Sequence, residues 1–424
     1  MHHTSSASGA AVHHRTRRFI ALEWLRFILG LYIVIFHTLH YYPSIASWSG
    51  YVTGLGFFAT STFFILSGFL LTHVYLRPQG DEKHYALRES KRSFWIRRWA
   101  NLYPIHIGAM VITIIVMVLL PIFQLAPEDN AASIRAVMLD VNNGDVIWHT
   151  MTNSELFMAA IENITLLQAW NPYYLTFNPP TWSISTLFFF YLVFPWLAVW
   201  LWQRRYPFAW LLGVNALYLV PPVLAILLTS WGAPETGLLH RNPIIRLPEF
   251  AAGILLCVWY HRCARQTLSR RTAGTLIVGI VGSIVLGEWL LLPDHSAGWR
   301  YVLHNGLMMP AQLAIIYLCL FVKWPTRVFW QHLAARLGGA SLPMFALHVP
   351  LYLIFSRLEM ALTGWISGQS DSAVGAGGNG QAGHVALVGY PLFLVVTVVV
   401  CIVFQEQFVL RVRNVIQACL LKKL

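Results

Sequence analysis

Residues 19–41 read FIALEWLRFILGLYIVIFHTLHY. The stretch is apolar over a length that suffices to cross the ~30 Å hydrocarbon core of a bilayer, which takes about 20 residues. A polar segment ending in Arg15, Arg17 and Arg18 precedes it, and no small-residue cleavage site separates the two. A signal peptide would carry such a site. The sequence therefore predicts a retained first transmembrane helix.

The composition of the 424-residue chain extends this prediction to the whole molecule. Hydrophobic residues make up 57% and charged residues 11%, whereas soluble domains carry about 25% charged residues. We therefore predict an all-α, polytopic membrane protein with a bundle of ten transmembrane helices. The expected spans are Phe19–Tyr41, Leu55–Tyr75, Pro104–Leu125, Trp182–Trp202, Phe208–Leu228, Ile244–Tyr260, Thr275–Leu292, Leu307–Val322, Leu342–Leu358 and Val385–Val409.

The distribution of positive charge predicts the orientation. With the N-terminus in the cytoplasm, 23 Lys and Arg residues fall on inside segments and five on outside segments or outer helix ends. Cytoplasmic loops of membrane proteins carry such an excess. We expect a cytoplasmic tail over 1–18, a membrane domain over 19–410 and a cytoplasmic tail over 411–424. The outside segments 126–156 and 368–383 are an acidic loop and a flexible Gly-rich loop.

The net charge of +12 would suggest nucleic-acid binding in a soluble protein, but here it reflects the basic loops expected on the cytoplasmic side. Five cysteines lie in apolar or inside segments, so we expect no disulfide. They are Cys257, Cys263, Cys319, Cys401 and Cys419. We also expect no metal.

The first helix carries three ionisable residues, which are costly within a membrane and are therefore candidate functional groups. Glu23 and Arg26 are neighbours on one face because they are three residues apart. His37 follows Arg26 by eleven residues, which keeps it on the same stripe about 16 Å further along the axis. The alternative interpretation is an ion pair near the interface and an interfacial histidine without a catalytic role.

A basic and aromatic cluster follows the second span, between Lys91 and Pro104. Arg97 and Arg98 lie in it, and guanidinium groups suit phosphate binding. We expect a site for the phosphates of CoA, although much of the cluster also fits a cytoplasmic loop with interfacial aromatic residues. For Glu249 in the sixth span and His348 in the ninth, a structural role within the bundle is favoured over catalysis.

Six motifs in order resemble acyltransferase family 3, the bacterial membrane acyltransferases that modify surface polysaccharides. They are Glu23-Trp24-Leu25-Arg26 with His37; Phe63 to Phe69; Arg97-Arg98 with Tyr103-Pro104; Asn163 to Gln168 with Pro180 to Ser185; Arg246 to Phe250 with Gly253; and Gly338 to Pro350. The chain departs from the family pattern at Leu187, where an acidic residue is usual, and at Asn101, where an arginine is usual.

The resemblance implies O-acyl transfer from acyl-CoA, most often acetyl-CoA, to a sugar hydroxyl. His37 suits the general base because of its near-neutral pKa, Glu23 would neutralise or orient Arg26, and Arg26 would contact CoA together with Arg97 and Arg98. We assign lesser roles, in the acceptor site or in the structure, to Ser67, Trp182, Ser185, Glu249 and His348.

Two other functions remain open from the residues alone. A proton-coupled transporter or flippase for a glycan or lipid would use buried His, Arg and Glu as a proton relay. An inactive accessory subunit is the other. For the enzyme we expect the bacterial inner membrane, with membrane lipids, acyl-CoA and a glycan as partners. The glycan would be an exopolysaccharide, lipopolysaccharide or lipid-linked sugar, and other polysaccharide-assembly proteins are possible partners.

Overall fold

A computed structural model describes residues 19–79, 81–122, 134–139, 147–229, 232–263, 267–292, 294–325, 327–366 and 387–422. The expected tail 1–18 and the Gly-rich loop 368–383 lie outside these residues. So do residues 126–133 and 140–146 of the expected acidic loop, including Glu128, Asp129, Asp140 and Asp145.

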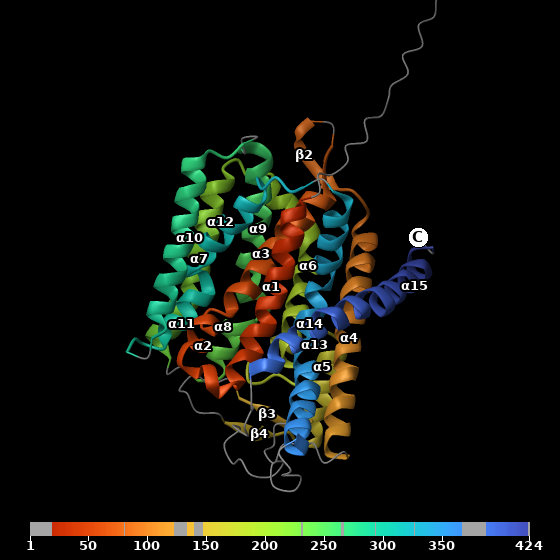
Figure 1. The fold of residues 1–424 in the computed structure, drawn as a ribbon. Helices are drawn as coiled ribbons and strands as arrows, with labels where there is room; N and C mark the ends of the chain where they lie inside the picture. The colour runs from red at the N-terminus through yellow and green to blue at the C-terminus, as the bar shows by residue number, and fades with distance from the viewer. Residues whose placement is uncertain are drawn as a thin grey trace, which may run out of the picture.

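The described part of the chain forms an upright bundle of long helices with a short pair of antiparallel strands at each end (Figure 1). The helices are α1 (Ile20–Thr38), α2 (Ala46–Thr53), α3 (Phe57–Tyr75), α4 (Lys91–Ile122), α5 (Asn153–Ile164), α6 (Trp182–Trp202), α7 (Pro207–Leu228), α8 (Glu235–Arg241), α9 (Pro243–Cys263), α10 (Arg270–Leu290), α11 (Gly298–Val302), α12 (Met309–Cys319), α13 (Val328–Ile366), α14 (Tyr390–Val403) and α15 (Leu410–Leu421). Antiparallel strands β1 (Leu76–Gln79) and β2 (Asp81–Leu87) form one hairpin, and β3 (Ala136–Met138) pairs with β4 (Trp148–Thr150).

Ten helices of the described part are long and apolar enough to cross a membrane, and each overlaps one predicted span. The predicted all-α, ten-span architecture is confirmed. Two boundaries differ. The third spanning helix, α4, begins at Lys91. The basic cluster therefore occupies the first turns of α4 and is not a loop. The ninth spanning helix, α13, runs over Val328–Ile366 and is much longer than the predicted span Leu342–Leu358.

Helix α13 continues through Pro350 because a side chain from another part of the chain binds the carbonyl that this proline leaves unbonded. Pro350 has no N–H for the carbonyl four residues earlier. That carbonyl, of Ala346, accepts a 2.7 Å hydrogen bond from Asn178 Nδ2. In α6, Pro195 likewise frees the Tyr191 carbonyl, which accepts from Trp95 Nε1 at 3.2 Å. Such long-range partners allow proline within membrane helices.

Helices α3 and α9 cross at the centre of the bundle through two glycines. A Cβ on Gly253 would clash with the Ile65 carbonyl, and a Cβ on Gly68 would clash with the Phe250 carbonyl. The backbones touch there, as small residues allow in membrane bundles. At the periphery, α7 and α10 expose Leu217, Leu227 and Val278, as lipid-facing helices do.

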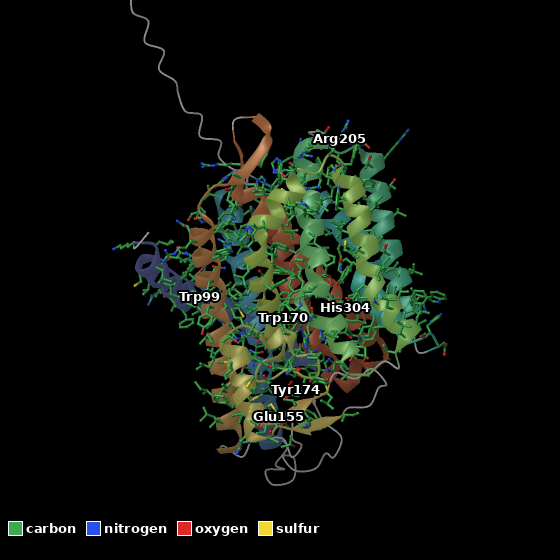
Figure 2. All side chains as sticks on the ribbon, turned by 180° about the vertical axis from the view of Figure 1, so that it is seen from behind. Trp99, Glu155, Trp170, Tyr174, Arg205 and His304 are labelled. Carbon is green, nitrogen blue, oxygen red and sulfur yellow. The ribbon has the colours of Figure 1, made fainter. Side chains whose placement is uncertain are left out.

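We call the end of the bundle that carries β1, β2 and Arg205 the basic end. Strands β3 and β4 lie at the opposite end (Figures 1 and 2). Helix α1 starts at the basic end. The segment 411–424, expected as a tail, is helical to Leu421, and α15 packs across α4 and points away from the bundle in Figure 1. The side of the membrane on which each end lies stays a prediction.

Candidate functional site

The ionisable stripe predicted on α1 is present, with Glu23 and Arg26 paired near the basic end. Arg26 Nη1 lies 3.2 Å from Glu23 Oε2, and both side chains are about a quarter exposed (26% and 23%). The Arg26 guanidinium also lies 5.9 Å from the centre of the Phe63 ring. Gly338 lets α13 lie close to α1, because a Cβ at this position would stand 2.5 Å from Glu23 Oε2.

Further along α1, His37 stacks against His348 of α13. The ring centroids are 4.7 Å apart and the planes are inclined by 29°. The contact depends on a second close approach of α1 and α13 at Gly30, where a Cβ would meet Met344 Cε at 2.8 Å. Two histidines separated by 311 positions thus form one unit, which sequence spacing did not predict.

The hydrogen bonds of the two imidazoles fix their tautomers. His37 Nδ1 lies 3.0 Å from the Ile33 carbonyl and His348 Nδ1 lies 2.8 Å from the Met344 carbonyl. A carbonyl oxygen only accepts, so in each ring Nδ1 carries the proton and Nε2 carries the lone pair. His348 is fully buried, and its Nε2 has no hydrogen-bond partner among the described residues. His37 is only partly buried, so it is the more accessible base.

Two further histidines lie near this centre and were missed by the sequence analysis. The His240 ring, from α8, lies 4.9 Å from Trp182 and 5.8 Å from His304. His304 lies in the kinked segment Leu303–Leu307 between α11 and α12, and is 7% exposed. His240 is close enough for electrostatic interaction with His37. Neither residue belongs to one of the six family motifs. The only sequence signal for the two histidines is that they occur beside apolar segments.

A completely buried ion pair on α9 faces the same region. Arg246 Nη2 lies 3.1 Å from Glu249 Oε2 and donates to Ser61 Oγ at 2.9 Å. Tyr218 donates to Glu249 Oε1 at 3.0 Å. Within the described residues, Arg246 Nε and Nη1 are buried without hydrogen-bond partners. Buried polar groups of this kind call for an explanation, such as an unseen ligand or a catalytic role.

The Arg246 guanidinium also lies over two aromatic rings, 5.6 Å from the centre of Phe64 and 5.9 Å from that of Trp182. Trp182, predicted in the acceptor or structural group, therefore links the ion pair to His240. The structure brings Trp182, Glu249, His37 and His348 to one half of the bundle, away from the basic end.

At the basic end, Arg97 and Arg98 are engaged differently. Arg97 Nε lies 2.9 Å from Glu89 Oε2, and the Arg97 side chain is 45% exposed. Arg98 Nη2 donates to the Tyr75 hydroxyl at 2.5 Å, with its guanidinium 4.9 Å from the Tyr75 ring centre. Arg98 Nε is buried without a partner in the described part of the chain. One arginine thus remains open to solvent and the other points a donor inward.

The two predicted serines have structural partners. Ser67 Oγ donates to the Phe63 carbonyl at 2.8 Å within α3. Ser185 Oγ donates to the Leu166 carbonyl at 2.6 Å and accepts from Ala169 N at 3.3 Å. Ser185 therefore ties α6 to the segment after α5. Leu187, where the family pattern has an acid, is fully buried.

The segment from α5 to α6 enters the bundle from the opposite end without crossing it. Thr152 and Glu155 form a reciprocal capping box that starts α5. Its twelve residues extend only about 18 Å, too little to span a bilayer. Phe157, Ile161 and Ile164 are nevertheless exposed. Figure 2 places Glu155 near the end of the molecule and Trp170 closer to its middle, as a re-entrant segment would.

A cavity of about 620 Å³, widely open to the surface, is formed by residues of this re-entrant segment. Its lining includes Met158, Ile161, Glu162, Trp170, Asn171 and Tyr173. Asn171 Nδ2 lies 3.4 Å from Glu162 Oε2, and burial raises the pKa of the Glu162 carboxyl. Aromatic faces, a carboxyl and an amide together suit a ligand with hydroxyl groups and an apolar part.

Helix α8 contacts both the lining of the cavity and the histidine centre. Arg241 Nε donates to the Asn171 carbonyl at 2.8 Å, and His240 precedes Arg241 in the same helix. A Cβ on Gly237 would clash with the Pro172 carbonyl, so α8 lies directly against the cavity wall. One short helix thus contacts both the cavity lining and the histidine centre.

A family model described as an acyltransferase domain matches residues 19–406. The acyltransferase MdmB of Streptomyces mycarofaciens is 28% identical over 49% of this chain and 48% of its own. The O-acetyltransferase OatA of Staphylococcus aureus is 23% identical over 78% of this chain and 50% of its own. The peptidoglycan O-acetyltransferase OatA of Listeria monocytogenes is 23% identical over 70% of this chain and 45% of its own.

The chain thus spans about half the length of these relatives. No solved structure matches it significantly.

Proposed function

Because the chain belongs to acyltransferase family 3, whose model spans residues 19–406, we propose that it transfers an acyl group from acyl-CoA to a sugar hydroxyl. The acyl group we propose is acetyl, in line with the names of the O-acetyltransferase relatives. The acceptor we propose is a glycan at the bacterial inner membrane: an exopolysaccharide, a lipopolysaccharide or a lipid-linked sugar.

The observation that carries the proposal is the orientation of His37. Its Nδ1 proton is held by the Ile33 carbonyl, which leaves the Nε2 lone pair for a substrate hydroxyl. In the reaction, Nε2 takes the hydroxyl proton while the oxygen attacks the thioester carbonyl carbon. The carbon–sulfur bond then breaks, and the CoA sulfur leaves with the proton that His37 returns. A positioned base of this kind accelerates transfer roughly 10²–10⁴-fold.

The donor would enter from the basic end. Arg97 offers an exposed guanidinium and Arg98 an inward donor, both suited to the phosphates of CoA. Arg26 lies near the same end of the bundle, about 16 Å along α1 from His37. Arg26 would therefore contact the extended arm of CoA, with Glu23 holding its side chain in place.

The acceptor would approach from the opposite end through the cavity beside the re-entrant segment. Trp170 and Tyr173 offer faces for a sugar ring, and Glu162 and Asn171 offer hydrogen-bond partners. The exposed apolar residues around them, Met158 and Leu167 among them, would contact a lipid or another apolar carrier.

A direct test uses purified protein in nanodiscs with radiolabelled acetyl-CoA and a panel of p-nitrophenyl glycosides as acceptor probes. We expect labelled ester on a glycoside and free CoA in equal amounts, both lost in His37→Ala. The histidine cluster also fits a proton relay in a transporter. If the protein consumes no acetyl-CoA under any condition but moves glycan across proteoliposomes in response to a pH gradient, the acyltransferase proposal is wrong.

A further inference from the structure

Three potential metal ligands meet where the ends of α3 and α9 lie together, well away from the proposed acyl-transfer centre. They are His73 of α3 and Cys257 and His261 of α9. His73 Nδ1 and His261 Nε2 are 3.1 Å apart, and the ligand atoms of all three residues lie within 4.8 Å of one another. Cys257 is a free, fully buried thiol, while His261 is exposed. The group therefore has one face open to solvent.

The crossing of α3 and α9 explains why these residues meet. Gly68 and Gly253 bring the two backbones into contact. His73 follows Gly68 by five residues, and Cys257 follows Gly253 by four, so each lies about one turn beyond the crossing. Cys257 and His261 are themselves four residues apart, which places them on one face of α9. The backbone thus holds three ligands in a fixed arrangement before any ion binds.

We propose that His73, Cys257 and His261 bind a thiophilic metal ion, Zn²⁺ or Cu⁺. Thiolate and imidazole are the ligands that these ions prefer. Around a zinc ion with Zn–N bonds of about 2.0–2.1 Å in tetrahedral geometry, two nitrogens would stand about 3.3 Å apart, close to the distance here. Three protein ligands leave a fourth position for water. The expectation of no metal would then be wrong at this place.

The alternative is a hydrogen bond between two neutral imidazoles, in which one N–H donates to the lone pair of the other. That arrangement leaves the Cys257 thiol without a function. Metal binding requires both nitrogens as lone-pair donors and the sulfur as thiolate. The two possibilities therefore differ in whether Cys257 matters, which makes it the decisive residue.

Metal binding would join α3 and α9 near the basic end. The same two helices supply Ser61, Arg246 and Glu249 of the buried polar network. An ion that binds only the folded protein stabilises it by mass action. The site is thus expected to act as a structural clamp, and this inference does not depend on the acyltransferase proposal.

Metal content of the purified full-length protein tests the inference. The protein is isolated with a tag that contains no histidine, from cells supplied with zinc and copper, and analysed by mass spectrometry of its elements. We expect about one equivalent of zinc or copper, removed by Cys257→Ser and by His261→Asn. Cys401→Ser, which changes another buried free thiol, should keep the metal. The element found distinguishes Zn²⁺ from Cu⁺.

Cobalt gives a second measurement. Co²⁺ added to the metal-free protein should produce a thiolate-to-cobalt charge-transfer band that is absent in Cys257→Ser. It should also raise Tm in the unmodified protein and in Cys401→Ser, but not in Cys257→Ser. If the unmodified protein contains no stoichiometric metal and shows no band with Co²⁺, the inference fails. It also fails if Cys257→Ser keeps the metal and the band.

Discussion

The imidazole of His37 stacks on that of His348, with ring centroids 4.7 Å apart. Each ring directs its Nδ1 proton to a carbonyl one turn earlier in its own helix. Both Nε2 atoms therefore carry lone pairs, but a proton on one ring disfavours a second proton on the other at this distance. The pair can accept one proton and return it, which is what a single acyl transfer requires.

The first prediction concerns the base. His37→Ala should lower acyl transfer roughly 10²–10⁴-fold while folded protein remains in the membrane. His40→Ala is the matched control, because His40 lies one turn further along, is exposed and contacts Tyr41 rather than His348. Acyl transfer is measured as ester formation at equal protein in the membrane.

The control variants decide whether His37 or His348 is the general base. His40→Ala should keep most of the activity. If His40→Ala is inactive and His37→Ala is active, the assignment of the base is wrong. If His37→Ala and His40→Ala are both active and His348→Gln is inactive, the buried partner of the pair is the base.

The second prediction concerns the donor. Arg97→Gln and Arg98→Gln should raise KM for acyl-CoA more than KM for the acceptor, because each removes a charged donor suited to phosphate. Arg205→Gln is the control at the same end of the bundle (Figure 2), where Arg205 stacks on Tyr206. A change confined to acceptor kinetics would overturn the donor assignment. Loss of protein from the membrane would show that the two arginines serve topology.

The third prediction concerns the acceptor cavity. Tyr173→Ala removes a side chain that is 49% exposed, and Glu162→Gln removes a charge but keeps the shape. Both should raise KM for the acceptor severalfold and leave KM for acyl-CoA unchanged. Tyr206→Ala, at the basic end and 60% exposed, should change neither. Unchanged acceptor kinetics in both cavity variants would exclude this entrance.

Sequence could predict the ten helices because membrane spans need only length and hydropathy, which are local properties. It placed Glu23, Arg26 and His37 on one stripe of α1 because helix periodicity is also local. The start of α4 at Lys91 was missed because charged residues precede the apolar run in the same helix. The length of α13 was missed because polar and charged residues such as Gln331, His332 and Arg336 precede its apolar run, so hydropathy marks only the middle of the helix.

The candidate site was predictable only in part. The stacking of His37 on His348 results from helix packing at Gly30, not from spacing. His240 and His304 lie in the short helix α8 and in the kinked segment Leu303–Leu307, just before the predicted spans Ile244–Tyr260 and Leu307–Val322. The meeting of His73 with Cys257 likewise requires the crossing of α3 and α9, which a single sequence does not encode in any local pattern.

The fourth prediction concerns the buried ion pair. Arg246 and Glu249 are both 0% exposed and 3.1 Å apart, so removing one partner leaves an uncompensated buried charge. Arg246→Gln or Glu249→Gln alone should therefore destabilise the protein by about 3–5 kcal/mol, seen as a lower Tm in detergent. Replacing both by Gln removes both charges, and Tm should recover most of the loss because the two effects are coupled.

Activity of the double variant then separates structure from chemistry. Arg246 keeps Nε and Nη1 unpaired in the described structure, and such donors could stabilise the oxyanion that forms when the hydroxyl attacks the thioester. If this is their role, the stable double variant should lose roughly 10²–10³-fold in kcat with little change in KM for either substrate. If its kcat is normal once Tm has recovered, the pair serves only to hold α9 against α3 and α7, through Ser61 and Tyr218.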